Sequence, residues 1–142
     1  DVVAEILKVK SQMDSGMFKP LQMAAVSALS QGPEWFRSLN EEYRRRRVLA
    51  GRIFDIIGAE YDHDSSGMFL WGRISSGNRF LNASAGPEVS LGEQVSDRIL
   101  YGAGVFITPG FIFGRNGRDY IRISLCAKPE VLERSAEKIS DL

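Results

Sequence analysis

The chain has 142 residues, the size of one domain, and its 44% hydrophobic and 25% charged residues are typical of a soluble globular protein. Its 18 Lys and Arg residues balance 18 Asp and Glu residues, so the overall charge attracts neither nucleic acid nor an anionic membrane. No apolar run approaches the roughly 20 residues that cross a bilayer. We therefore expect no nucleic-acid or membrane partner.

The only cysteine, Cys126, excludes a disulfide framework within the chain, so a reducing, cytoplasmic setting is the simplest interpretation. Cys126 follows a predicted strand and has no basic cluster beside it, which favours a core position. The chain begins at Asp1 rather than at Met, and Val2 and Val3 already belong to a helical pattern. We therefore expect it to be a piece of a longer protein, called the parent below.

Three helices are expected in the first part of the chain. Residues 2–12 carry apolar side chains at mostly helical spacing. Residues 20–30 are rich in Ala, Leu and Met and begin with Pro20, a residue favoured in the first turn of a helix. The apolar stripe of the third and longest helix runs from Pro33 to about Ile57.

The pattern changes from helical to extended after Gly58. Residues 68–71 are continuously apolar, which is typical of a strand buried on both faces. Residues 74–87 are rich in Ser, Gly and Asn and are expected to form a loop. The remaining elements are predicted as a helix over about 88–100, a short strand over 105–107, an alternating strand over 120–125 and a helix from Pro129 to about Ile139.

This order of elements predicts an α+β fold, in which helices cover a small antiparallel or mixed sheet. The long helix 33–57 is expected to pack on a sheet that includes 68–73 and 119–125. Residues 1–30 have no strands beside them, so we expect a helical remnant of a large-domain or interdomain segment there. Residues 31–142 then form the small domain.

Four consecutive arginines, Arg44 to Arg47, lie in the predicted long helix. They could form a phosphate or nucleic-acid patch. Successive helical residues, however, point in directions about 100° apart. Glu41 and Glu42 lie three or four residues before some of these arginines, a spacing that favours ion pairs on a helix. We therefore expect a solvated helix face in which some of the arginines pair with these glutamates.

Residues 62–67 (Asp-His-Asp-Ser-Ser-Gly) are similar to the first half of a calcium-binding EF-hand loop. The twelfth position of such a loop should carry a bidentate Glu, and here it is Arg73. Without that ligand we expect no metal site. His63, the only histidine, is expected to be a turn residue between two aspartates rather than a catalytic group, because no partner or nucleophile is evident for it.

Arg122 is the residue that most strongly suggests binding. In the alternating strand 120–125 it lies on the opposite face from Ile121 and Ile123. An arginine in an apolar setting needs an anionic partner, and its planar fork suits a carboxylate held by two hydrogen bonds. That partner is either a ligand carboxylate or an internal Asp or Glu.

At these residues the sequence resembles class I/II aminotransferases of the pyridoxal-phosphate (PLP) fold type I superfamily, specifically their C-terminal small domain. The segments that carry the resemblance are 105–110 (Val-Phe-Ile-Thr-Pro-Gly), Phe113-Gly114, 120–124 (Tyr-Ile-Arg-Ile-Ser), 67–71 (Gly-Met-Phe-Leu-Trp) and 1–30 with Ser15-Gly16 before an Ala-rich helix. They cover nearly the whole chain in the order found in that family.

The resemblance implies a parent that uses PLP to transfer an amino group between an amino acid and a 2-oxo acid, and that is a homodimer. It implies that Arg122 binds the α-carboxylate of the substrate and that Phe69 lies near the substrate or the cofactor. It also implies that Ser15 and Gly16 approach the cofactor site at the subunit interface.

One departure from the family concerns the lysine that holds the cofactor. That lysine lies in a Ser-x-x-Lys-like context, which none of the lysines here matches: Lys8, Lys10, Lys19, Lys128 and Lys138. The carboxylate that pairs with the pyridinium nitrogen belongs to the large domain of the family. We therefore expect no catalytic residue in this chain, no stable PLP binding, and no activity of the chain alone.

Two alternatives remain from the sequence. The chain could be a non-catalytic α+β module that binds a carboxylate-bearing small molecule through Arg122. It could also be the aminotransferase-like domain of a regulator. The sequence does not name the amino-acid substrate.

Overall fold

The computed structural model describes residues 1–14 and 16–142. The chain divides into two compact units, residues 1–39 and 40–142, and the division falls inside the long helix α3 (Pro33–Ile57). No helix in the described residues combines the length and the apolar character that crossing a membrane requires.

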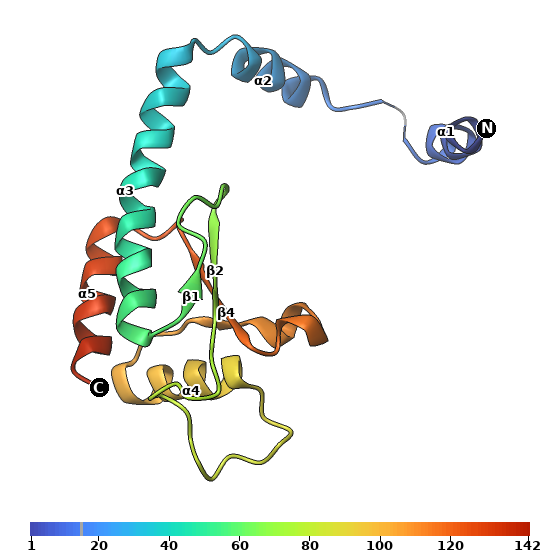
Figure 1. Ribbon diagram of the computed structural model, residues 1–142. Helices are drawn as coiled ribbons and strands as arrows, with labels where there is room; N and C mark the ends of the chain where they lie inside the picture. The colour runs from blue at the N-terminus through green and yellow to red at the C-terminus, as the bar shows by residue number, and fades with distance from the viewer. Residues whose placement is uncertain (15) are drawn as a thin grey trace. The chain divides into compact units, whose positions relative to one another are not determined.

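The first unit is helical (Figure 1). It contains α1 (Val2–Met13), α2 (Lys19–Leu29) and the first residues of α3. Helix α1 begins after Asp1, whose side chain accepts a hydrogen bond from the backbone N–H of Val3 and so satisfies one of the free donors of the first turn. Neither α1 nor α2 contains a buried residue, although both carry large apolar side chains.

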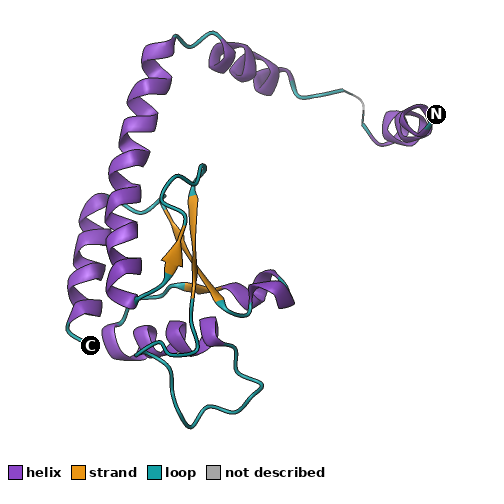
Figure 2. Ribbon diagram, viewed as in Figure 1, coloured by secondary structure: helices purple, strands orange, loops and turns teal. Residues whose placement is uncertain are grey.

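The second unit is built on a four-stranded antiparallel sheet in the order β1-β2-β4-β3 (Figure 2). The strands are β1 (Glu60–Tyr61), β2 (Phe69–Arg73), β3 (Thr108–Pro109) and β4 (Tyr120–Ser124). The helices of this unit are α4 (Leu91–Ala103), α5 (Pro129–Ser140) and the part of α3 from residue 40 onward. Two short 3₁₀ turns, η1 (Gly110–Phe113) and η2 (Arg115–Gly117), connect β3 to β4. The predicted α+β fold is confirmed.

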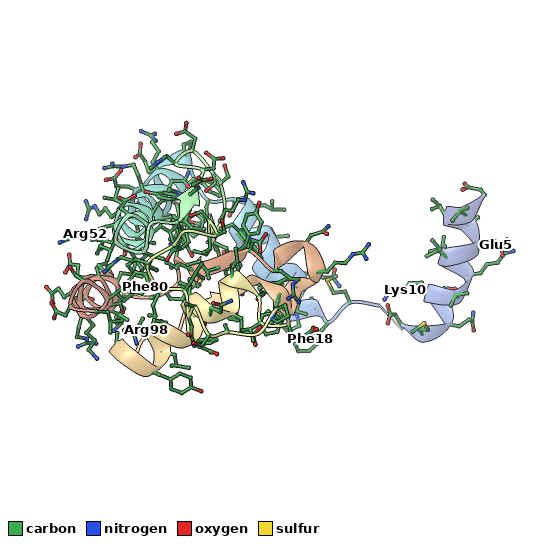
Figure 3. The ribbon with its side chains drawn as sticks, turned by 60° about the horizontal axis from the view of Figure 1, so that its bottom comes forward. Glu5, Lys10, Phe18, Arg52, Phe80 and Arg98 are labelled. Atoms are coloured by element: carbon green, nitrogen blue, oxygen red, sulfur yellow. The ribbon has the colours of Figure 1, made fainter. Side chains whose placement is uncertain are left out.

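One face of the sheet, called the inner face below, packs on the helices. Leu70 of β2 and Ile121 and Ile123 of β4 lie on this face and are buried. They join one hydrophobic core with apolar residues of α3, α4 and α5, namely Ala50, Ile53, Phe54, Ile57, Val95, Ile99, Leu132, Ala136 and Ile139. Phe80, labelled in Figure 3, is also buried and belongs to this core, whereas Arg52 and Arg98 are exposed.

Helix α4 fixes the start of β4. Its first turn is closed by a reciprocal capping box between Ser90 and Glu93, which satisfies free backbone donors at the helix start. Gly92 then lies so close to the backbone of Tyr120 that a Cβ atom would overlap its carbonyl oxygen. The backbone N–H of Gly92 donates to the carbonyl of Arg118 at 2.9 Å. The glycine therefore lets the helix touch the strand directly.

Helices α1, α2, α3 and α5 lie within one or two residues of their predicted bounds, and α3 ends just before Gly58 as expected. Helix α4 begins about three residues later than predicted, after the Ser90 cap. The strand predicted over 105–107 is wrong, since the strand is β3 at Thr108–Pro109. The carbonyl of Ile107 accepts a hydrogen bond from the buried hydroxyl of Ser96 on α4. The Ile107 carbonyl therefore bonds a helix residue and not a neighbouring strand.

Two burial predictions are also wrong. Strand β2 is buried on one face only, because no layer of the second unit covers the side that carries Phe69 and Trp71 in the described residues. Cys126 is exposed rather than in the core. Strand β4 ends at Ser124 and the chain turns there, which carries Cys126 out of the sheet. The short edge strand β1 was not predicted, since two residues are too few to show an alternating pattern.

Candidate functional site: an arginine enclosed by aromatic rings

The second face of the sheet, called the outer face below, carries Phe69 and Trp71 of β2 and Arg122 of β4. The antiparallel register sets Trp71 directly opposite Arg122, and Thr108 of β3 opposite Arg122 on its other side. Directly opposed side chains of an antiparallel pair lie on the same face. The alternation predicted for Arg122 is therefore confirmed, because its neighbours Ile121 and Ile123 are buried on the inner face.

The guanidinium of Arg122 lies between two phenylalanine rings. Its Cζ is 4.1 Å from the ring centroid of Phe69 and 4.2 Å from that of Phe113, and 6.0 Å from the ring of Trp71. Cations at these distances are attracted to the electron-rich faces of aromatic rings. The rings hold the flat guanidinium in place, and they take up none of its N–H donors in conventional hydrogen bonds.

Edge contacts of Trp71 support the Phe113 ring. Trp71 meets Phe113 at a centroid distance of 5.3 Å and Tyr120 at 6.4 Å, both in the edge-to-face arrangement that aromatic pairs favour. Phe113 comes from the short turn η1, which follows β3. Residues from β2, β4 and η1 therefore meet around one charged group.

The Nε atom of Arg122 is buried and has no hydrogen-bond partner in the part of the chain that the structure describes. Among the described residues, Arg122 also forms no ion pair with a carboxylate. A buried donor without a partner carries a free-energy cost of about 1–3 kcal/mol, and more when the group is charged. The internal Asp or Glu that the sequence left open as the partner of Arg122 is absent from these residues.

A shallow hollow of about 310 Å³ adjoins this group. It is lined by Phe69 and Trp71 and by the loop before β2, with Asp62, Ser65, Ser66, Gly67 and Met68. His63 lies in the turn of this loop, as predicted, with its ring 4.3 Å from that of Tyr61. The described residues contain no group of three or more ligands suited to a metal ion.

The run of four arginines divides into two pairs on α3. Arg44 and Arg45 are exposed and pair with Glu41, and Arg44 holds the pKa of the Glu41 carboxyl at about 2 through a side-chain hydrogen bond. Arg46 bonds Glu42. These ion pairs confirm the predicted pairing with Glu41 and Glu42, and the solvated helix face is confirmed for Arg44 and Arg45 but not for Arg46, which is half-buried. Arg47 differs, because its two bonds reach residues of the loop before β2.

Phe69 and Arg122, the two predicted substrate-binding residues, lie together on the outer face. Ser15 lies outside the described residues. Gly16 belongs to the first unit, where its φ of 102° falls in the left-handed region that favours glycine. Sequence reasoning did not single out Trp71 and Phe113 as partners of Arg122. The signal for Trp71 was its position two residues after Phe69, on the same face of a strand.

Comparison with known proteins supplies the identity of the fold. No family model matches the chain. The chain is 33% identical over 141 residues to an LL-diaminopimelate aminotransferase of Oleidesulfovibrio alaskensis, covering 99% of this chain and 33% of the relative. It is 31% identical over 142 residues to the LL-diaminopimelate aminotransferase of Aquifex aeolicus, covering 100% of this chain and 34% of the relative.

Solved structures agree with the sequence relatives. The apo structure of BacF from Bacillus subtilis matches with a TM-score of 0.73 at 30% identity, covering 94% of this chain and 33% of that protein. The chain spans about a third of the length of the curated relatives it matches. It is thus related over its whole length to class I/II pyridoxal-phosphate-dependent aminotransferases of fold type I, and it corresponds to their C-terminal, small-domain portion.

Proposed function

We propose that the parent of this chain is a PLP-dependent aminotransferase that transfers an amino group between an amino acid and a 2-oxo acid, and that Arg122 binds the α-carboxylate of both. The observation that carries the proposal is the Nε of Arg122, buried and without a partner in the described residues. A carboxylate supplies the acceptor oxygens that this donor lacks, in the geometry that an arginine fork prefers.

The α-carboxylate is common to the amino acid and the 2-oxo acid, so one arginine serves both directions of the transfer. PLP, when bound in the parent, supplies the electron sink for the chemistry at the α-carbon. Arg122 orients the substrate by holding its carboxylate. The rings of Phe69 and Phe113 cover the guanidinium and limit the access of water to it, and lower local polarity strengthens the attraction between the two charges.

The remaining assignments belong to the same proposal. Residues 1–30 are a helical remnant of the large-domain or interdomain segment, and residues 31–142 are the small domain. Support comes from the contrast in burial, because α1 and α2 bury no residue. Ser15 and Gly16 approach the cofactor in the parent. The parent is a cytoplasmic homodimer.

The test is the kinetics of the parent with Arg122 replaced. Arg122→Lys keeps the charge but loses the fork, and Arg122→Ala removes both. Charge-assisted hydrogen bonds are worth about 1.5–3 kcal/mol each, so losing two predicts a fall in kcat/KM of the order of 10²-fold or more. Normal kcat/KM in a folded Arg122→Ala variant would reject the role of Arg122.

We also propose that the 142-residue chain alone neither transaminates nor holds PLP stably. None of its five lysines lies in the family's cofactor-lysine context. The chain is incubated with PLP, reduced with borohydride and digested, and the modified lysines are located by mass spectrometry. We expect scattered, weak labelling and no turnover, whereas specific labelling of one lysine together with turnover would contradict the proposal.

A further inference from the structure

The second half of the arginine run joins α3 to the ends of the two central strands. Arg47 donates from Nη1 to the hydroxyl of Ser65 and from Nη2 to the carbonyl of Gly67, each at 3.0 Å. Arg46 donates from Nη1 to the carbonyl of Leu125 at 3.2 Å. The backbone N–H of Leu125 in turn donates to the carbonyl of Met68 at 2.8 Å. Two successive arginines therefore hold the segment before β2 and the segment after β4 at the edge of the site.

This clamp acts on the residues immediately before Phe69. Gly67 has a φ of 91°, a left-handed conformation that places the bend of the loop at the carbonyl held by Arg47. Met68 follows, with its carbonyl bonded to Leu125, and Phe69 is the first residue of β2, paired with Ser124 of β4. The direction in which Phe69 leaves the loop is thus set by bonds to Gly67 and Met68.

The loop has few other attachments that could do this. Within it, the backbone N–H of Asp64 donates to the side chain of Asp62 at 2.9 Å, and Ser65 N–H to the Asp62 carbonyl at 3.4 Å. Those bonds shape the turn but do not connect it to the helix. Residues 62–64 and 66–68 are exposed. An exposed loop with few long-range bonds is held in place mainly by those it has.

We propose that Arg47 is a positioning residue: by anchoring Ser65 and Gly67 to α3, it holds the Phe69 ring against the guanidinium of Arg122. The effect of Arg47 on substrate binding rests on the proposed function, since Phe69 and Arg122 form the proposed site. The positioning of the Phe69 ring by Arg47 does not depend on that function. Arg47 binds the loop through its planar fork, which lysine cannot reproduce.

The test uses the 142-residue chain and the NMR signal of the Arg122 Nε–H. Aromatic rings near this group displace its chemical shift, and the Cζ of Arg122 lies 4.1 Å from the Phe69 ring and 4.2 Å from the Phe113 ring. The change in the Nε–H chemical shift on Phe69→Leu is the contribution of the Phe69 ring, called the Phe69 share. The change on Phe113→Leu is likewise the Phe113 share. No carboxylate ligand is added, so the readout is independent of whether Arg122 binds one.

We expect Arg47→Gln to lose most of the Phe69 share while keeping the Phe113 share. Arg47→Lys should fall between Arg47→Gln and the unmodified chain. The double variant Arg47→Gln/Phe69→Leu should show no further loss beyond Phe69→Leu, as expected when two residues act through one contact. Arg45→Gln is the matched control, since Arg45 is an exposed neighbour on the same helix and, among residues 1–14 and 16–142, pairs with Glu41 alone. It should leave the signal unchanged.

Circular dichroism and melting temperature establish whether each variant folds. If Arg47→Gln does not fold, the Nε–H signal of Arg47→Lys is used in its place. An Nε–H signal unchanged in a folded Arg47→Gln or Arg47→Lys chain would overturn the inference, whatever happens to stability. Equal losses of the Phe69 and Phe113 shares would also overturn it, because they would indicate general loosening. Normal substrate kinetics in the parent with Arg122→Ala would instead remove the proposed function. It would leave the geometric role of Arg47 standing, provided that Arg47→Gln in the 142-residue chain loses the Phe69 share.

Discussion

Arg122 and its two neighbours on β4 lie on opposite faces of one sheet and in different chemical settings. Ile121 and Ile123 face the helices and are buried in the core, whereas Arg122 faces the other way among aromatic rings. The inner face is closed by α3, α4 and α5 of the same unit. The outer face retains a buried donor without a partner in the described residues. Within five residues, the strand thus places core residues on one face and the proposed binding residue on the other.

The largest effect on stability is expected on the inner face. Ile121 is fully buried between the sheet and the helices, so Ile121→Ala removes buried methyl groups and leaves a cavity. We expect a loss of about 2–5 kcal/mol in the free energy of unfolding, measured by urea denaturation of the 142-residue chain. A loss no larger than that of an outer-face truncation would break the division between the two faces.

A smaller loss is expected where α4 touches β4 through backbone alone. A Cβ at Gly92 would overlap the carbonyl oxygen of Tyr120, so Gly92→Ala must push the helix away from the strand. We expect about 1–3 kcal/mol of destabilisation, typical of overpacking, again from urea denaturation. Gly77→Ala is the control, because nothing lies within 4 Å of a Cβ added there. Equal stability of the two variants would contradict the close approach.

On the outer face, Trp71→Leu should cost little stability. Trp71 is 39% exposed and its contacts are edge contacts with Phe113 and Tyr120, which are worth about 0.5–1.5 kcal/mol per aromatic pair. The thermal midpoint should therefore fall far less than in Ile121→Ala. A drop as large as that of Ile121→Ala would show that the outer face is part of the folding core.

The smallest effect is expected in the exposed half of the arginine run. Arg44 lowers the pKa of Glu41 to about 2 from 4.5. A carboxyl whose pKa is lowered by folding adds stability above its unfolded pKa and loses it as pH falls toward the folded value. Because the Glu41 side chain is 44% exposed and that of Arg44 66% exposed, solvent screens the pair, and Glu41→Gln should have the same free energy of unfolding as the unmodified chain at pH 7. A clear difference between the two chains in urea denaturation at pH 7 would contradict this.

The sequence predicted most of the second unit, because its helices and β4 carry strong local patterns. The helical pattern of α3 and the alternation of Ile121, Arg122 and Ile123 are local, and both elements were confirmed, although α3 buries its apolar residues only from Ala50 onward. The errors depend on tertiary structure. The apolar run around Leu70 could not reveal that one face of β2 is left open, and the Ser96 hydroxyl that binds the Ile107 carbonyl comes from a distant helix.

The site was predicted only in part, for the same reason. Arg122 and Phe69 were found from strand alternation and family resemblance, and the structure brings them together. Phe113 joins them through a 3₁₀ turn that has no clear sequence period. The two bonds of Arg47 span 18 and 20 residues along the chain, and no pattern within the helix distinguishes Arg47 from the arginines that face solvent.

The most direct test of the outer face as a carboxylate site is an NMR titration of the 142-residue chain with pyruvate. We expect saturable displacement of the Arg122 Nε–H signal, little displacement with the neutral analogue pyruvamide, and weaker pyruvate binding in Arg122→Lys. We expect the melting temperature of Arg122→Ala to stay close to that of the unmodified chain, because Arg122 forms no internal ion pair in the described residues. The contrary result is an Nε–H signal that ignores pyruvate together with a large fall in the melting temperature of Arg122→Ala, which would make Arg122 a structural residue.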